Sequence, residues 1–413
     1  MLEPYRVLDL TDERGLLCGR LLGDLGAEVI QIEPPGGSRA RRLGPFAGDV
    51  PHPDRSLYWW AYTRNKRSLT LDLERTAGRD LLVELARTAH FLVESDDPGT
   101  LAARGLAYAD LAAVNPALIY VSITPFGQTG PRAGWAASDL VLWAAGGPLV
   151  LTGDSDRPPV RLPIPQAYLH ASADAAVAAL IAHHERQRSG RGQHVDVSAQ
   201  QSVALATQSY ILCDAVGHPP VRRSAGGLVN GPLRLRLLFP ARDGHVAITF
   251  LFGSAIGPFS RRLMEWICAE GGCDTATRDK DWIGYTEALL SGAEPLAEFE
   301  RVKHVVEEFT RTKTKAELLE ASLARGLLIA PVAAIDEVLA SPQLAAREYW
   351  QDLPHPELGR TVRYPGAFAR FSASPIAARR RAPTVGEHSD EILRDALGLD
   401  DAARTRLRAE GIT

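Results

Sequence analysis

Two side chains in the middle of the chain could take part in chemistry. Tyr168 stands at the head of an alanine-rich segment, and Asp139 lies upstream in the run Ala-Ser-Asp-Leu. A phenol, whose ordinary pKa is about 10, stays protonated near neutral pH, so Tyr168 would act as an acid or hydrogen-bond donor rather than as a nucleophile. Asp139 is a candidate acid, although its surroundings favour a role in capping a loop.

Several arginines could bind phosphate. Arg39, Arg41 and Arg42 directly follow a pair of glycines. Guanidinium groups suit phosphate recognition, so these three, together with Arg14 and Arg75, are candidates for holding a nucleotide-like ligand. The residues after the glycine pair could equally form a solvated basic turn, and the sequence leaves both interpretations open.

Strand and helix patterns alternate through the first third of the chain. Their spacing predicts strand–helix–strand units and therefore a parallel, doubly wound α/β sheet with helices on both faces. The predicted strands are Arg6–Leu10, Glu28–Ile32, Ser68–Leu73, Phe91–Glu94 and Leu118–Ile123. The predicted helices are Leu16–Leu25, Thr76–Ala89 and Tyr168–Arg188, the last with Leu169, Ala173, Ala176, Val177 and Leu180 on one apolar side.

The middle of the chain differs in character from its ends. Leu238–Phe250 has the pattern of a β-hairpin, and amphipathic helical segments follow it. We therefore predict a Rossmann-like large domain that begins with residues 1–223, a smaller inserted α+β domain over 224–325, and a return to the large domain over 326–413.

Composition excludes some classes of function. A net charge of −4 over 413 residues gives no electrostatic argument for binding nucleic acid or an anionic membrane. No apolar run approaches the roughly 20 residues that span a bilayer, and no signal peptide is apparent. The four cysteines lack metal-ligand spacing, so no metal site is expected. Reduced thiols predict a cytoplasmic protein.

Motifs along the chain carry a family resemblance through their joint order and spacing. In the N-terminal half they are Arg20–Gly37, Asn65–Leu73, Asn115–Ser122, Phe126–Pro131 and Gly190–Gln193, and in the C-terminal half Ala330–Val332, Glu337–Gln343, His355–Gly359 and Gly386–His388. Together they resemble the class III CoA-transferase (CaiB/BaiF) family. The resemblance implies a Rossmann-like fold, two chains threaded into an interlocked dimer, and transfer of CoA between an acyl-CoA and a carboxylic acid.

The catalytic aspartate of that family is missing. In the family, an aspartate at the head of the helix attacks the acyl-CoA thioester, forming first a mixed anhydride and then an enzyme–CoA thioester. Counting back from Gly190–Gln193 without a gap, its place is taken by Tyr168. The racemase branch also uses a histidine just before the position of Asp139, which is Ser138 here, and this argues against α-proton racemase activity.

The segments that contact CoA in the family also differ. The family's Glu-Asn-Phe-x-Pro-Gly loop reads Glu-Ser-Asp-Asp-Pro-Gly at Glu94–Gly99, and Asp96 and Asp97 would repel a polyanionic ligand. A small Ala-Gly-Pro turn is replaced by Glu13–Leu17, and a common lysine by Glu74. We therefore expect a weakened CoA site.

Three hypotheses follow. The chain could be the non-nucleophilic subunit of a heteromeric CoA-transferase, because some members of the family, benzylsuccinate CoA-transferases among them, work as two related chains. Its partner would then be a homologous chain that carries the aspartate. Alternatively, the chain forms a homodimer that processes acyl-CoA with Tyr168 in place of the aspartate. The third hypothesis is a non-enzymatic binding protein on the same scaffold.

Overall fold

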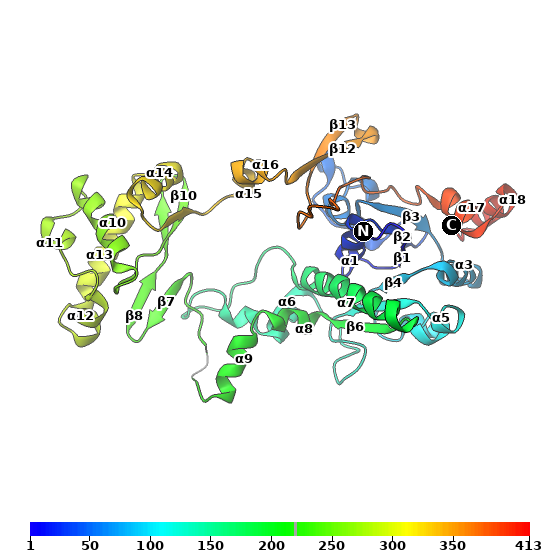
Figure 1. Cartoon of the computed structure of the whole chain (residues 1–413), viewed down its shortest axis with the longest axis horizontal. Coiled ribbons are helices and arrows are strands. Elements are labelled where there is room, and N and C mark those ends of the chain that lie inside the picture. The colour runs from blue at the N-terminus through cyan, green and yellow to red at the C-terminus, as the bar shows by residue number, and fades with distance from the viewer. Residues whose placement is uncertain (219–220) are drawn as a thin grey trace. The chain divides into compact units, whose positions relative to one another are not determined.

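The chain forms two compact units. The computed structural model describes residues 1–218 and 221–413 (Figure 1). The large unit comprises Met1–Leu149, Arg161–Pro220 and Pro342–Thr413, and the small unit comprises Val150–Val160 and Val221–Ser341. The small unit thus takes in a short upstream segment and continues past residue 325. The domain boundaries drawn from the sequence stay a prediction.

A six-stranded parallel sheet forms the centre of the large unit, in the order β3-β2-β1-β4-β5-β6. The order reverses direction between β1 and β4, and in such sheets ligands bind outside the carboxyl ends of the strands at this point. The predicted α/β fold is confirmed, although β6 was not predicted. The strands are β1 (Arg6–Asp9), β2 (Glu28–Glu33), β3 (Lys66–Thr70), β4 (Phe91–Glu94), β5 (Ile119–Thr124) and β6 (His194–Ser198).

Helices cover both faces of this sheet. Val7, Val93 and Val121 pack on one face with α1 (Leu16–Asp24) and α7 (Ala167–Ser189). Leu8 and Leu92 pack on the other face with α3, α5, α17 and α18. Besides α1 and α7, the large unit contains these four helices and several others. Their bounds are α2 (Leu57–Thr63), α3 (Thr76–Thr88), α4 (Thr100–Ala103), α5 (Tyr108–Val114), α6 (Asp139–Gly146), α8 (Ala199–Leu205), α9 (Gln208–Ala215), α16 (Pro342–Ala346), α17 (Ser389–Leu397) and α18 (Asp401–Ala409).

Helix α7 presents alanines, not larger apolar residues, to the sheet. Val177, which we expected on the apolar side, is 57% exposed, so that part of the prediction is wrong. Small side chains let the helix backbone approach the strands closely, which keeps this interface densely packed. The buried stripe consists of Ala167, Ala171, Ala175, Ala179 and Ala182.

The small unit combines short antiparallel strands with amphipathic helices. Strands β9 (Leu238–Ala241) and β10 (Gly244–Ile248) form the predicted hairpin, and β11 (Ile329–Pro331) pairs with β10. Aromatic side chains pack with aliphatic ones in its core. The other elements are β7 (Gly227–Asn230), β8 (Leu233–Arg236), α10 (Gly257–Ala269), α11 (Thr275–Arg278), α12 (Tyr285–Ser291), α13 (Leu296–Arg311), α14 (Lys315–Arg325) and α15 (Ile335–Leu339).

A short hairpin and several 3₁₀ turns complete the secondary structure. A hairpin of β12 (Trp350–His355) and β13 (Arg360–Pro365) belongs to the large unit. Single 3₁₀ turns occur at Arg39–Arg42, Ala47–Asp49, Pro53–Arg55, Pro148–Leu151 and Pro356–Leu358.

A buried ion pair fixes the end of β1. The ammonium of Lys66 lies 2.7 Å from the Asp9 carboxylate and donates to Gln31 at 2.8 Å, and both charged side chains are fully buried. The other oxygen of Asp9 accepts from the backbone N–H and the hydroxyl of Thr11, which begins the turn after the strand. A Cβ on Gly19 would lie 1.8 Å from Asp9, so glycine is required where α1 passes this pair.

Lys66→Met should destabilise the large unit strongly, because it leaves the Asp9 carboxylate buried without its cation. Losing one partner of a buried pair costs about 3–5 kcal/mol, which should appear as a lower midpoint in urea unfolding. Arg87→Met is the control. It removes an exposed pair with Glu84 at 2.8 Å and should cost less than about 1 kcal/mol. Equal effects of the two substitutions would contradict this view of the β1 end.

Candidate active site at the carboxyl ends of the strands

A cavity of about 500 Å³ lies in the large unit where the strand order reverses. Its walls come from the segments after β1, β2, β4 and β5, from α2 and from the starts of α6 and α7. The volume falls within the range of small-molecule sites. The lining residues are Glu13, Arg14, Arg39, Leu43, Tyr58, Asp97, Pro125, Ala136, Ala137, Ser138, Asp139, Pro165, Tyr168 and Leu169.

Tyr168 lies in this cavity, on the first turn of α7. Its hydroxyl is shielded from solvent and has no hydrogen-bond partner in the part of the chain that the structure describes. Burial raises the pKa of Tyr168 to about 12, against the opposing effect of the Arg14 charge. The side chain is therefore a neutral phenol near neutral pH, able to donate a hydrogen bond but not to attack a thioester.

Asp139 positions the start of α7. One carboxylate oxygen accepts from the backbone N–H of Gln166 at 2.6 Å and of Ala167 at 2.8 Å. These bonds satisfy donors that a helix leaves unpaired at its first turn. These contacts are of the capping kind that the sequence favoured for Asp139, while its Oδ2 is buried without a hydrogen-bond partner among the described residues. Through this cap, Asp139 fixes where Tyr168 enters the cavity wall.

The two cations of the cavity are already bound to acids. Arg14 donates to Asp12 with Nε at 3.0 Å and Nη2 at 2.9 Å, and its Nη1 lies 2.8 Å from Asp97. Arg39 pairs with Asp12 and with Glu13, both at 2.9 Å. Burial would raise the pKa of Asp12, but the hydrogen bonds and charge of Arg14 lower it below its ordinary value. We call these five residues the Arg14 cluster.

The other predicted phosphate-binding arginines lie away from the cavity lining. Arg41 is buried, pairs with Glu33 at 2.6 Å and lies over the ring of Trp59, so its role is structural. Arg42 and Arg75 are exposed, and Arg75 donates to the carbonyl of Glu410. Of the five predicted arginines, the structure brings only Arg14 and Arg39 to the cavity.

Sequence reasoning missed some of the site. Leu43 lines the cavity although it carries no motif. Tyr58, an aromatic residue that the sequence placed near the pocket with core packing as an equal alternative, does line the cavity. Sequence reasoning also missed Asp12, although the spacing of Asp12 and Arg14 matches a turn in which the acid binds the backbone two residues on, as the Arg14 N–H does at 3.0 Å. Asp96 lies near Arg104, at 3.6 Å, and does not line the cavity.

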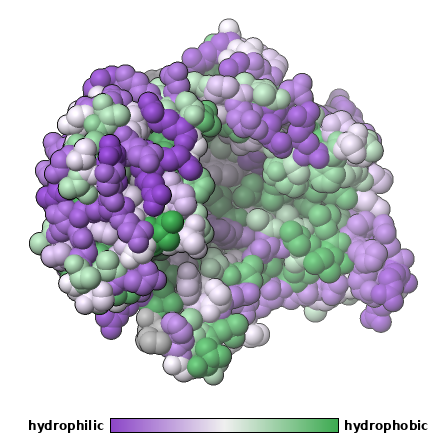
Figure 2. Space-filling view, turned by 60° about the vertical axis from the view of Figure 1, so that its left-hand side comes forward, coloured by the Kyte–Doolittle hydropathy of each residue, from purple (hydrophilic) through white to green (hydrophobic). Residues whose placement is uncertain are grey.

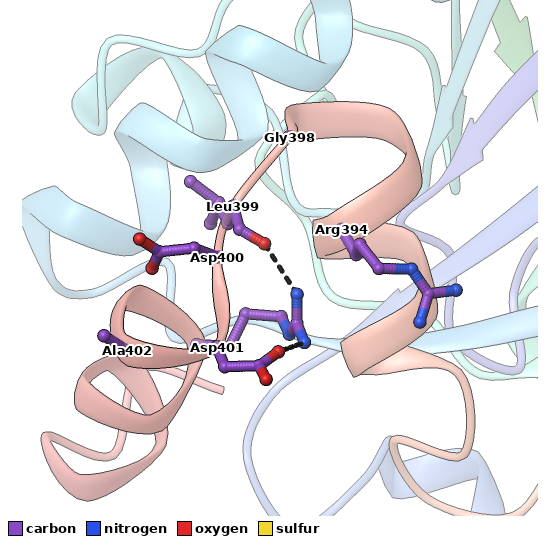
Figure 3. A pocket seen from close by; sticks show the side chains of 7 residues that line it. Arg394, Gly398, Leu399, Asp400, Asp401 and Ala402 are labelled. Atoms are coloured by element: carbon purple, nitrogen blue, oxygen red, sulfur yellow. Dashed lines mark hydrogen bonds and ion pairs between the residues drawn. The ribbon is translucent and has the colours of Figure 1, made fainter.

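A second, open hollow of about 650 Å³ lies at the turn between α17 and α18. Its arginine, Arg404, donates to the carbonyl of Leu399 at 2.6 Å and pairs with Asp401, as the dashed lines in Figure 3 show. Arg394 points away from this pair in the same view (Figure 3). The hollow thus results from the way one helix turns into the next and offers no candidate for group transfer.

The described residues contain neither a membrane-spanning helix nor a cluster of metal ligands. Within 1–218 and 221–413 we find no helix with the length and apolar character needed to cross a bilayer. The same residues contain no group of three or more His, Cys, Asp or Glu side chains that could hold a metal ion.

Comparison with known proteins identifies the family. The sequence model of CoA-transferase family III matches residues 2–389. The chain belongs to CoA-transferase family III. The CaiB/BaiF resemblance is therefore confirmed. The family enzymes transfer CoA and so use acyl-CoA as a substrate.

Relatives and a solved structure agree with this membership. Succinyl-CoA:(R)-benzylsuccinate CoA-transferase subunit BbsE of Thauera aromatica is 38% identical over 394 residues, which cover 94% of this chain and 92% of the relative. Succinyl-CoA–D-citramalate CoA-transferase of Chloroflexus aurantiacus is 32% identical over 414 residues, with 100% and 98% covered. The crystal structure of a CaiB/BaiF family protein from Brucella suis has a TM-score of 0.81 at 27% identity and covers 96% of this chain and 99% of its own.

The protonation state of Tyr168 can be measured directly. In protein labelled with ¹³C at the tyrosine ζ-carbon, the resonance absent from Tyr168→Phe belongs to Tyr168. Because burial raises the pKa of Tyr168 to about 12, this resonance should keep the shift of the neutral phenol up to about pH 10, where an exposed tyrosine is already half ionised. A midpoint below pH 9 would mean that phenolate is available for catalysis.

Proposed function

We propose that the chain is the pocket-completing subunit of a heteromeric class III CoA-transferase. A homologous partner chain supplies the aspartate that attacks the acyl-CoA. This chain supplies the scaffold, one wall of the substrate pocket and a neutral hydrogen-bond donor, Tyr168. The two chains pair as an interlocked dimer, and together they move CoA between an acyl-CoA and a carboxylic acid.

The observation that carries the proposal is the state of the acids in the cavity. A class III nucleophile has to be a carboxylate that is free to attack. Asp139 holds two backbone N–H groups, Glu13 pairs with Arg39, and Asp97 pairs with Arg14. Tyr168, at the position of the family aspartate, stays protonated. Each of these acids thus has at least one oxygen in an ion pair or a backbone hydrogen bond, and Oδ2 of Asp139 is buried without a hydrogen-bond partner among the described residues. Because Asp139 is held by the start of α7 and no carboxylate stands at position 168, we place the nucleophile on the partner chain.

The Arg14 cluster supports the same conclusion for CoA binding. Three carboxylates, from Asp12, Glu13 and Asp97, neutralise the two arginines at the edge where a doubly wound sheet receives its ligand. Because the cluster has more acids than bases, the phosphate groups of CoA would meet net repulsion there. The nucleotide part of CoA is better held by the partner.

Exposed apolar side chains support assembly with another chain. Figure 2 shows apolar residues gathering in patches on an otherwise hydrophilic face. Contiguous patches of this kind mark protein contacts. In the large unit, Val177 and Ile181 are 57% and 65% exposed on α7, and Ile211 and Leu212 are 59% and 63% exposed on α9. The name of the Thauera relative also describes a subunit.

One observation favours a second candidate, a homodimer that processes acyl-CoA without a partner. The Tyr168 hydroxyl has no hydrogen-bond partner among the described residues, and a buried donor without a partner costs about 1–3 kcal/mol. A thioester oxygen could accept that hydrogen bond. In this candidate Tyr168 stabilises the reacting carbonyl and no enzyme-bound acyl group forms.

The proposal predicts that turnover requires both chains. The chain should be purified alone and together with a homologue that carries aspartate at the position of Tyr168, and CoA transfer from succinyl-CoA to a carboxylic acid should be assayed in both. We expect turnover only in the mixed complex. Replacing the partner's aspartate by asparagine should lower it by about a thousandfold or more, because a covalent step is lost.

Tyr168→Phe in the mixed complex is the matched substitution in this chain. It should reduce turnover by no more than about tenfold, because it removes a single hydrogen bond. Full turnover by this chain without a partner would contradict the subunit role. If that turnover were also abolished by Tyr168→Phe, the second candidate would replace the first.

A further inference from the structure

The ion pair between Arg14 and Asp97 joins a shielded cation to an exposed acid. Both residues line the 500 Å³ cavity, and Nη1 of Arg14 lies 2.8 Å from the Asp97 carboxylate. The Arg14 side chain is only 13% exposed, whereas that of Asp97 is 78% exposed. The other side-chain nitrogens of Arg14 donate to Asp12. Asp97 therefore pairs with Nη1, the nitrogen of the guanidinium that does not donate to Asp12.

The second cation of the cavity, Arg39, is paired with acids as well. Nε of Arg39 donates to Glu13 at 3.0 Å, and its Nη2 lies 2.9 Å from both Asp12 and Glu13. Asp139 adds another carboxylate to the wall, although one of its oxygens accepts from backbone N–H groups. An anionic group that entered the cavity would meet cations that are already paired, together with the charges of these acids.

The remaining lining suits an uncharged, apolar group. Leu43, Pro125 and Leu169 contribute aliphatic surface, and Tyr58 contributes an aromatic ring whose hydroxyl donates to the Glu13 carbonyl at 3.0 Å. Sites of this size usually combine such surface with a few polar groups that decide which ligand is accepted. Here that polar group is the Asp97 carboxylate, which competes with a carboxylate of the ligand for Arg14.

We propose that Asp97 is a specificity-determining residue that keeps carboxylates out of this cavity by occupying the Nη1 edge of Arg14. In its presence the cavity takes an uncharged apolar or aromatic group, such as the body of an acyl chain, while the carboxyl group that exchanges CoA lies outside this cavity, toward the partner's aspartate. Without it, Arg14 receives the carboxylate of an organic acid instead. The inference rests on the proposed function only in that it treats this cavity as part of the substrate pocket.

Two matched compounds test the proposal with the full chain. 3-Phenylpropanamide and 3-phenylpropanoate have the same body and differ in charge, and their dissociation constants can be measured by calorimetry at low salt. Wild type should bind the amide more tightly than the carboxylate. Asp97→Asn should tighten carboxylate binding by about threefold to fivefold, as expected for one exposed ion pair, and leave amide binding unchanged. The gain should fade as salt is added.

Asp80→Asn is the matched control, because it changes the net charge equally on the exposed side of α3, outside the cavity lining. It should alter neither dissociation constant. The proposal is overturned if wild type prefers the carboxylate, if Asp97→Asn leaves the ratio of the two constants unchanged, or if neither compound binds any form. None of these results bears on whether turnover needs a partner chain, so the subunit role stands or falls separately.

Discussion

The guanidinium of Arg14 lies between carboxylates from two different loops, and the arrangement of the site depends on this placement. Asp12 follows β1 and Asp97 follows β4, the two strands between which the sheet reverses its order. The backbone N–H of Asp12 also donates to the Ser95 hydroxyl, which follows β4, at 3.1 Å. The edge where parallel sheets of this kind bind nucleotides is therefore cross-linked by the protein's own charges. Because Arg14 is already paired with two carboxylates, it would bind a phosphate group only weakly.

The scaffold places this cluster through small side chains and buried charges. Asp9, held by Lys66, fixes the end of β1 and the turn that contains Asp12 and Arg14. On the other side of the cavity, the alanine stripe lets α7 lie close to the sheet, and Asp139 caps its first turn. Tyr168 thus enters the cavity from a helix that is fixed along its length and at its start. Its chemistry is limited by its own protonation state, not by poor placement.

The sequence predicted what depends on local pattern. Strands such as Phe91–Glu94 begin with a continuous apolar run, here Phe91–Val93, because both faces of the sheet are covered. Motif spacing alone predicts that Tyr168 takes the place of the family aspartate. The sequence predicts that Asp96 and Asp97 repel CoA, but it does not show that Asp96 lies near Arg104 and that Asp97 pairs with Arg14. Arg14 and Asp97 are 83 positions apart, so only the fold brings them together. Arg41 shows the same limit: a basic residue in a turn proves to be buried against Glu33.

In the proposed heteromer, covalent chemistry takes place on the partner and not on this chain. Intact-mass spectrometry of the mixed complex, quenched in acid shortly after addition of succinyl-CoA, tests it most directly, because a class III nucleophile carries the acyl group or CoA as a covalent adduct during turnover. We expect an added mass on the partner chain, lost when its aspartate is replaced, and an unchanged mass for this chain. An adduct on this chain would contradict the subunit role.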